Sequence, residues 1–302
     1  MGNSSLILPA LERNQSHKQE GEAHFSYSQL NMYNRCGQQY KYRYDDGLIQ
    51  PPNLKMGSGK AIHEALEYNA KHKMRVKEDM PIEQVLDTAA TAHDKFMAEV
   101  EDLDRKAAGK DKDESQSIVG LYRRQQAPTI TPLAAEYEFR IVLEEDETGF
   151  DYRPVIGYID AASELPDPRD GPTKNQRIIA VEDYKKVGQK KSQLEVDISP
   201  QLTLYDYVYT LHTEGEVPDV IGLRQLGFNG PRAQSPGPYS IPIYRSPEYH
   251  TSEARTNRHK RVLNQLKQAQ RAIQAGVFIA VDDPRVCSWC GYRDICQVKP
   301  EV

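Results

Sequence analysis

The chain has 302 residues, enough for one large domain or two small ones. Lys and Arg number 39 against 44 Asp and Glu, giving a formal net charge of −5 that argues against a non-specific nucleic-acid coat protein. A DNA enzyme stays compatible with this charge, because local basic patches matter more than the sum. The mean hydropathy is −0.73, and no apolar run reaches membrane-spanning length, so we expect no membrane partner.

The N-terminus is polar apart from a short apolar run. It lacks the basic start and the long apolar stretch of a signal peptide. We therefore expect a flexible leader over residues 1–23, followed by a single domain over 24–302. Four cysteines without a secretion signal indicate free thiols in a reducing cytoplasm.

Helical patterns come first along the chain. Ser26 or Ser28 can cap a helix that contains Cys36, and a second helix follows with His63 on it. The expected helices are residues 26–42, a segment starting near 58, 82–107 and 118–126, with a polar linker at 109–114.

The pattern changes period after residue 130. Three apolar stretches separated by turn-rich segments predict an antiparallel meander, and a helix opening at Pro200 precedes a fourth strand. The expected strands are 134–143, 155–165, 177–185 and 221–228; residues 229–251 read as an irregular excursion and 252–275 as a long basic helix. The alternation predicts an α/β fold with a mixed central sheet flanked by helices.

Two carboxylates and a lysine stand at the ends of neighbouring predicted strands. Asp160 ends one strand, and Asp183 and Lys185, two residues apart, share a face of the next. If these strands pair, the two carboxylates converge and can bind Mg²⁺ or Mn²⁺, which activates water at a phosphate. A surface ion pair between Asp183 and Lys185 is the alternative.

The cysteines are split one plus three. Cys287, Cys290 and Cys296 follow the spacing C-x2-C-x5-C, and Cys36 is the only other cysteine that could complete a four-thiolate site. Structural zinc sites are usually made from two close pairs, so the split favours an iron–sulfur cluster over zinc. Four unrelated buried thiols are the third reading.

Two basic patches accompany these motifs. One contains Lys190 and Lys191, and the other lies on the late basic helix. Each patch, taken alone, is compatible with a solvated surface.

Several short motifs in order resemble one known family. They are Gly59-x3-His63-x3-Glu67, Gly157-x2-Asp160, Asp183-Tyr184-Lys185 and Gln201-x3-Tyr205. With the split cysteines, the segment from Ser26 to Cys296 resembles the iron–sulfur branch of the RecB-type PD-(D/E)xK nucleases. That branch includes CRISPR-adaptation and AddB-type nucleases.

The resemblance implies a restriction-endonuclease-like core with a helical N-terminal portion and a C-terminal iron–sulfur knuckle. It implies Mg²⁺ or Mn²⁺ ligands at His63, Asp160, Asp183 and the Tyr184 carbonyl. Lys185 would be the catalytic lysine, and Gln201 and Tyr205 would contact the DNA backbone or orient Lys185. Glu136 is either an outer-sphere carboxylate or a solvent-facing strand residue, and His63 taken alone could be an ordinary helix histidine.

The implied function is a metal-dependent DNA exonuclease with a structural 4Fe-4S cluster, acting in recombination, repair, or phage or CRISPR DNA processing. The substrate would be DNA that is single-stranded or has free ends, and a recombination or replication protein could be a partner. The expected DNA contacts are Lys190, Lys191, Arg258, Lys260, Arg261 and Lys267. The alternatives are a DNA-end-binding iron–sulfur module with a vestigial nuclease site, and a zinc-stapled structural protein.

Overall fold

A computed structural model describes residues 4–145, 147–167 and 176–298. The chain divides into two compact units. The first comprises Met1–Gln15, Pro51–Glu138 and Tyr158–Asn257; the second comprises Ser16–Gln50, Phe139–Gly157 and Arg258–Val302. Each unit is described by itself.

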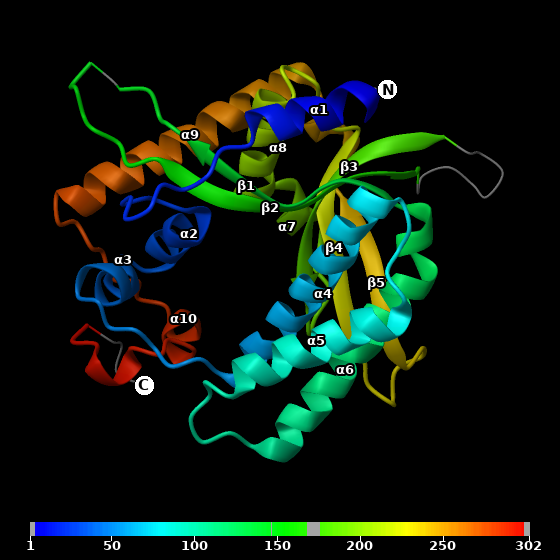
Figure 1. Cartoon of the computed structure of the whole chain (residues 1–302). Coiled ribbons are helices and arrows are strands. Elements are labelled where there is room, and N and C mark those ends of the chain that lie inside the picture. Colours follow the sequence, from blue (N-terminus) through cyan, green and yellow to red (C-terminus); the bar gives the residue numbers. More distant parts are fainter. Residues whose placement is uncertain (1–3, 146, 168–175, 299–302) are drawn as a thin grey trace. The chain divides into compact units, whose positions relative to one another are not determined.

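A five-stranded mixed sheet forms the centre of the fold, with the strands in the order β1-β2-β3-β4-β5 (Figure 1). Strands β2 and β3 are antiparallel, β3 and β4 are parallel, and β4 and β5 are antiparallel. The parallel pair requires a crossover, which helix α8 supplies between β3 and β4. The strands are β1 (Thr131–Ile141), β2 (Val155–Pro166), β3 (Arg177–Lys186), β4 (Val220–Asn229) and β5 (Gly237–Tyr244).

Helices cover both faces of β3 and β4. Three long helices, α4 (Leu54–Val76), α5 (Ile82–Met97) and α6 (Arg105–Gln125), lie against one face in Figure 1. Alternate residues of β3 pack towards these helices, whereas Asp183 is hydrogen-bonded to α8 (Pro200–His212). Because neighbouring strand residues point to opposite faces, the helices on the two faces contact different residues of the same strand. The first unit also contains α1 (Ser4–Asn14) and the short α7 (Gln193–Asp197).

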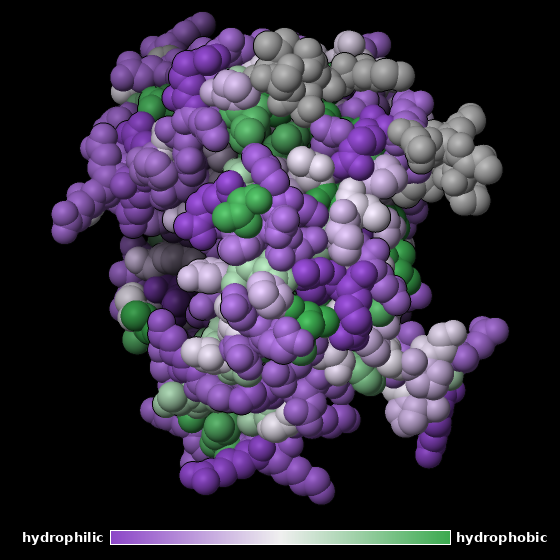
Figure 2. All heavy atoms as spheres, turned by 45° about the vertical axis from the view of Figure 1, so that its right-hand side comes forward, coloured by the Kyte–Doolittle hydropathy of each residue, from purple (hydrophilic) through white to green (hydrophobic). Residues whose placement is uncertain are grey.

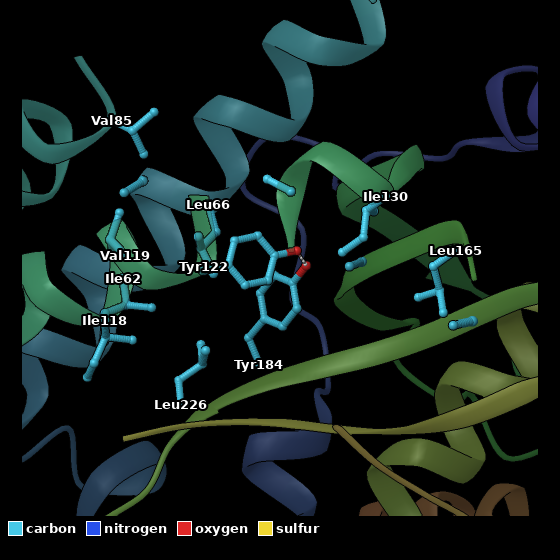
Figure 3. Close-up of a cluster of buried hydrophobic side chains, with 14 of the residues drawn as sticks. Ile62, Leu66, Val85, Ile118, Val119, Tyr122, Ile130, Leu165, Tyr184 and Leu226 are labelled. Atoms are coloured by element: carbon cyan, nitrogen blue, oxygen red, sulfur yellow. Dashed lines mark hydrogen bonds between the residues drawn. The ribbon is translucent and has the colours of Figure 1, made fainter. Parts of the chain in front are cut away.

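A hydrophobic cluster joins the three-helix layer to the sheet (Figure 3). Ile62 and Ile118 are fully buried in it, and the hydroxyls of Tyr122 and Tyr184 lie 3.0 Å apart at its centre. Each fully buried aliphatic side chain contributes about 1.5–3 kcal/mol. The cluster therefore anchors α4, which carries His63, to the strand that carries Asp183.

An ion pair between β3 and β4 lies buried beside this cluster. Glu182 accepts two hydrogen bonds from Arg224, at 2.8 and 2.7 Å, and a third from the hydroxyl of Tyr244 at 2.7 Å. Both charged side chains are buried, so removing either partner would leave an uncompensated charge. The pair pins the backbone of β3 next to Asp183.

The second unit contains α2 (Tyr27–Arg35), α3 (Gly37–Tyr40), most of α9 (Ser252–Gln274) and α10 (Pro284–Ser288). Ser26 caps α2 by accepting a hydrogen bond from the N–H of Gln29, as the sequence predicts. Gly37 approaches the C-terminal segment closely: its N–H donates to the Ile279 carbonyl over 2.8 Å, and a Cβ there would lie 2.6 Å from the Ile279 nitrogen. Only glycine permits this contact between the two ends of the chain.

Several sequence predictions differ from the structure. The helix expected over 82–107 ends at Met97, and the linker expected at 109–114 lies inside α6, whose N-cap is Asp104. Lysine–acid pairs one helical turn apart stabilise such a polar helix. The irregular excursion at 229–251 contains β5, and residues 4–14, within the predicted flexible leader, form α1 with Ile7 and Leu11 buried.

The face shown in Figure 2 is mostly hydrophilic, with hydrophobic residues in scattered patches. Among the described residues, no helix combines the length and apolar character needed to cross a membrane.

Candidate active site

The pairing of β2 with β3 brings the predicted acidic residues together. Ala161 pairs with Glu182, so Asp160 and Asp183 follow at the next step of the antiparallel register. The backbone N–H of Tyr184 donates to Oδ2 of Asp160 over 2.8 Å. The register of β2 and β3 therefore places the carboxylates of Asp160 and Asp183 at the same end of the paired stretch.

Side chains of α8 and β3 surround Asp183, which is fully buried. Its Oδ1 accepts a hydrogen bond of 2.8 Å from Gln201, and its Oδ2 lies 2.9 Å from Nζ of Lys185. The Tyr205 hydroxyl lies 3.3 Å from Oδ1 of Asp160 and 3.5 Å from Oδ1 of Asp183, so it bridges the two carboxylates. Gln201 and Tyr205 are one helical turn apart and contact each other at 3.1 Å.

His63 reaches the same place from α4. Its Nε2 lies 2.7 Å from the Tyr184 carbonyl, which can only accept, so Nε2 carries the proton. Its Nδ1 lies 3.4 Å from Oε1 of Glu136 and 3.6 Å from Oδ2 of Asp160. When the ring is neutral, the Nδ1 lone pair faces both carboxylates, which is the arrangement of a metal-ligating histidine.

Glu136 occupies a strained position on β1. Its φ is 45°, in the left-handed region that non-glycine residues seldom adopt. Such a conformation costs about 1–3 kcal/mol and persists only where the surroundings impose it. Glu136 lies where a run of consecutive buried residues on β1 gives way to regular alternation, and its carboxylate lies 3.4 Å from Nδ1 of His63.

Burial and mutual repulsion shift the titration of these groups. Burial, with the charge of Asp183 added, raises the pKa of Asp160 to about 7. Burial also raises the pKa of Asp183, although Lys185 opposes this. For His63, burial lowers the pKa, but the hydrogen bond to Glu136 and the charges of Asp160 and Glu136 outweigh it and raise the pKa to about 9. Two crowded carboxylates and a histidine therefore hold protons that a cation could displace.

The sequence profile described as "PD-(D/E)XK nuclease superfamily" matches residues 24–297. The chain belongs to the PD-(D/E)XK nuclease superfamily. The mixed sheet with helices on both faces confirms the predicted α/β fold class.

Other comparisons are weaker than the superfamily match. Among solved structures, the chain is similar to a Eubacterium rectale protein named "Putative exonuclease", with a TM-score of 0.48 and 10% sequence identity. The similarity covers 100% of this chain and 96% of that protein. No curated protein matches the chain in sequence.

PD-(D/E)XK nucleases use divalent metals, and the donor set here fits one. Ligand atoms of His63, Glu136 and Asp160 all lie within 4.8 Å of one another. Oxygen donors suit Mg²⁺ and Mn²⁺, and the imidazole adds a preference for Mn²⁺. Asp183 is not part of this trio; its two oxygens contact Gln201 and Lys185. The Tyr184 carbonyl orients His63, while its role as a ligand stays a prediction.

The four cysteines lie together in the second unit of this nuclease. Cys36, Cys287, Cys290 and Cys296 line one pocket, whose wall also includes Ala280, Val281, Val286 and Val298. Burial raises the pKa of the Cys290 thiol, and the charges of Cys36, Cys296 and Cys287 raise it further. The structure therefore brings residue 36 and the C-terminal cysteines to a single apolar place, and four soft donors there fit a metal cluster or zinc.

The predicted DNA-contact residues fall into two groups. Lys190 and Lys191 belong to the first unit, where Lys190 lies over the Tyr239 ring and Lys191 is ion-paired to Glu195 at 2.8 Å. The other four, Arg258, Lys260, Arg261 and Lys267, lie on the part of α9 that belongs to the second unit.

Sequence reasoning undervalued Glu136 among the residues of the site. The sequence left it as an outer-sphere carboxylate or a solvent-facing residue, and in the structure its carboxylate lies within 4.8 Å of ligand atoms of His63 and Asp160. A positive φ at a glutamate leaves no mark in a single sequence. The only available signal was its place on the strand next to Asp160.

Proposed function

We propose that this PD-(D/E)XK protein is a metal-dependent deoxyribonuclease, more specifically a DNA exonuclease of the RecB-type iron–sulfur branch. One observation carries the proposal: hydrogen bonds and ion-pair contacts join Asp160, Asp183, Lys185 and His63 where the pairing of β2 with β3 stops. The substrate is DNA that is single-stranded or has free ends. On the same resemblance we propose that the protein acts in the cytoplasm, in recombination, repair, or phage or CRISPR DNA processing. A recombination or replication protein is the proposed partner.

His63, Asp160 and Asp183 are the proposed metal ligands, with Glu136 beside them and the Tyr184 carbonyl as a further candidate. A bound Mg²⁺ or Mn²⁺ would supply an activated water and would offset negative charge on the scissile phosphate. The Tyr205 hydroxyl holds the two carboxylates at a fixed separation, and Gln201 keeps Oδ1 of Asp183 oriented.

Lys185 is the proposed catalytic lysine. Its ammonium contacts the buried Asp183 on one side, and its side chain is partly exposed, so it can reach a substrate phosphate. In that position it orients the attacking water and balances the charge that develops on phosphorus-bound oxygens. Lys185 and Asp183 act on the same reacting atoms, so their loss should not be additive.

The four cysteines are the proposed ligands of a structural 4Fe-4S cluster. Their pocket is lined both by apolar side chains and by Gln38, Gln39, Tyr42 and Arg293. Cys36 lies next to Gly37, which contacts the C-terminal segment directly. Holding Cys36 to residues 287–296 closes a loop of about 250 residues, which restricts the unfolded chain. This link lies within the second unit, and the single domain over 24–302 is proposed from the resemblance, which runs through both units.

End-labelled DNA tests the activity. Protein with Mn²⁺ should release short products progressively from DNA ends, and Asp183→Ala should reduce the rate by at least about 10³-fold, as expected when a metal ligand is lost. A covalently closed circular single strand is the control, because an exonuclease leaves it intact. If Asp183→Ala cleaves at the wild-type rate, the site is not catalytic. Tight DNA-end binding without cleavage would instead support a vestigial site.

A further inference from the structure

A second polar cluster lies in the three-helix layer, away from the carboxylate site. Lys186 of β3 contacts the hydroxyl of the fully buried Ser58 on α4, and its Nζ lies 2.7 Å from Oδ1 of Asp111 on α6. The other oxygen of Asp111 lies 3.2 Å from Nε2 of His93 on α5. One chain of contacts therefore links four elements, starting at the residue that follows Lys185.

His93 stands at the end of this chain. Its side chain is only 1% exposed, and its Nδ1 has no hydrogen-bond partner among the described residues. A buried polar atom without a partner costs about 1–3 kcal/mol, so a native protein seldom retains one without a use. Because Asp111 can only accept, it fixes the proton on Nε2 and leaves Nδ1 directed elsewhere.

His93, which carries this Nδ1, lines an open groove between α5 and α6. The groove is also lined by Arg105 and Lys112, and its remaining wall includes Met97 and Leu103. The acidic residue present, Asp94, is 62% exposed and is ion-paired to Lys112 at 2.5 Å, with its other oxygen 3.9 Å from Nδ1. An incoming anion can replace this exposed carboxylate as the partner of Lys112 and His93.

We propose that this groove binds a phosphate group through His93, Arg105 and Lys112. One proton shared between Nδ1 of His93 and a phosphate oxygen joins the two while Asp111 holds Nε2, and the guanidinium of Arg105 and the ammonium of Lys112 supply charge-assisted hydrogen bonds to the other phosphate oxygens. The ligand is either a phosphate of the DNA backbone or a free phosphate ion. The DNA source rests on the nuclease function proposed above, whereas phosphate binding itself does not.

Phosphate binding in the groove would restrict the positions of residues at the active site. The phosphate fixes His93, which fixes Asp111 and through it Lys186, adjacent to Lys185 on the same strand. Ser58 transmits the same constraint to α4, which carries His63. The groove therefore positions catalytic groups without touching the reacting atoms.

Calorimetric titration of metal-free protein with inorganic phosphate tests the site. Phosphate bound beside Lys185 at the carboxylate site would not be weakened by a change in the groove, so the groove variants show which of the two sites is measured. We expect saturable binding with one phosphate per chain, weakened at least tenfold in His93→Gln and in Lys112→Gln. The matched control is Lys110→Gln, which changes the same charge on α6 at a side chain 80% exposed, and it should bind as wild type does. Absence of saturable binding, or binding that neither variant weakens, overturns the proposal.

Cleavage kinetics then separate the two sources of phosphate. If the ligand is the DNA backbone, Lys112→Gln raises KM for an oligonucleotide several-fold, and added phosphate competes with it. If the ligand is free phosphate, KM stays constant and added phosphate changes kcat in the wild type but not in Lys112→Gln. If the protein cleaves no DNA, the proposed nuclease function is wrong. The phosphate titration still tests whether the groove binds phosphate, because it does not depend on cleavage.

Discussion

Nε2 of His63 donates to the backbone carbonyl of Tyr184 over 2.7 Å. Tyr184 stands between the acid and the lysine of the D-Y-K motif, so this bond ties the α4 histidine to the strand that carries both. It also selects the tautomer in which Nδ1 faces Glu136 and Asp160. The ring of His63 is therefore already oriented for metal binding, and a cation has only to displace the proton on Nδ1.

Glu136→Gln should weaken Mn²⁺ binding about tenfold or more, because the carboxylate nearest to Nδ1 of His63 loses its charge. Isothermal titration with Mn²⁺ measures this. Glu138→Gln is the matched control on the same strand: Glu138 accepts a hydrogen bond from Tyr158 and is not in the ligand trio. Equal affinities of the two variants would show that Glu136 is not a ligand.

Metal affinity should rise with pH between about 6 and 9. Asp160, with a pKa raised to about 7, and His63, with a pKa raised to about 9, both hold protons in the metal-free protein at the lower end of this range. A cation must displace these protons, so each one lost before binding increases the apparent affinity. Titration in buffers of different ionisation enthalpy should show proton release near pH 7. Binding that is independent of pH and releases no protons would contradict the assigned ligands.

The same shifts predict a stability cost in metal-free protein. A carboxylate whose pKa is raised from 3.8 to about 7 stabilises the fold below pH 4, and this contribution is lost as the pH rises through 7. His63 contributes in the same direction between pH 6.5 and about 9. Asp160→Asn should therefore raise the free energy of unfolding at pH 8 by roughly 1–4 kcal/mol.

Urea denaturation of chelator-treated protein at pH 4 and pH 8 measures this difference. At pH 4 the variant and the wild type should be nearly equal, because Asp160 is then protonated in the fold. A variant less stable than wild type at pH 8 would mean that the ionised carboxylate is well solvated or paired.

The sequence predicted the strands of the site because their apolar alternation is long and their turns are clear. It therefore placed Asp160 and Asp183 on neighbouring strands, and their convergence followed from antiparallel pairing alone. Local spacing likewise predicted the contact of Gln201 with Tyr205, one helical turn apart.

Features that depend on tertiary context were not predictable. The positive φ at Glu136 is imposed by its surroundings. The contacts of Lys186 with Asp111 and of Glu182 with Arg224 join residues far apart in the chain. Strand β5 was missed because it lies in a Pro- and Ser-rich segment, where pairing with β4 overrides weak strand propensity.

Neutralising Arg258, Lys260, Arg261 and Lys267 should flatten the salt dependence of DNA binding. If these side chains contact phosphates, each lost contact reduces the slope of log K against log salt by about 0.7 on single strands. Fluorescence anisotropy with labelled DNA at several salt concentrations measures the slope. Arg75→Gln, at an exposed basic side chain near the end of α4, is the control. An unchanged slope in the fourfold variant would show that these residues only solvate the helix.

Cys36→Ala should abolish the absorption of the iron–sulfur cluster and lower the melting temperature of the protein. The proposed cluster has no other N-terminal thiolate, because the remaining three cysteines lie within residues 287–296. Wild-type protein made without oxygen should contain iron and sulfide and absorb broadly near 400 nm, as iron–sulfur proteins do. The variant should lack this absorption and should melt at a lower temperature.

Tyr42→Phe separates the loss of the cluster from a general loosening of the second unit. This change removes a hydroxyl, 3.4 Å from the Ile295 carbonyl, from a residue that lines the same pocket, but it keeps all four thiols. It should keep the iron and the absorption near 400 nm. If wild-type protein contained stoichiometric zinc and no iron, the cluster proposal would be wrong. The same four cysteines would then form a zinc site, since four thiolates also suit tetrahedral zinc.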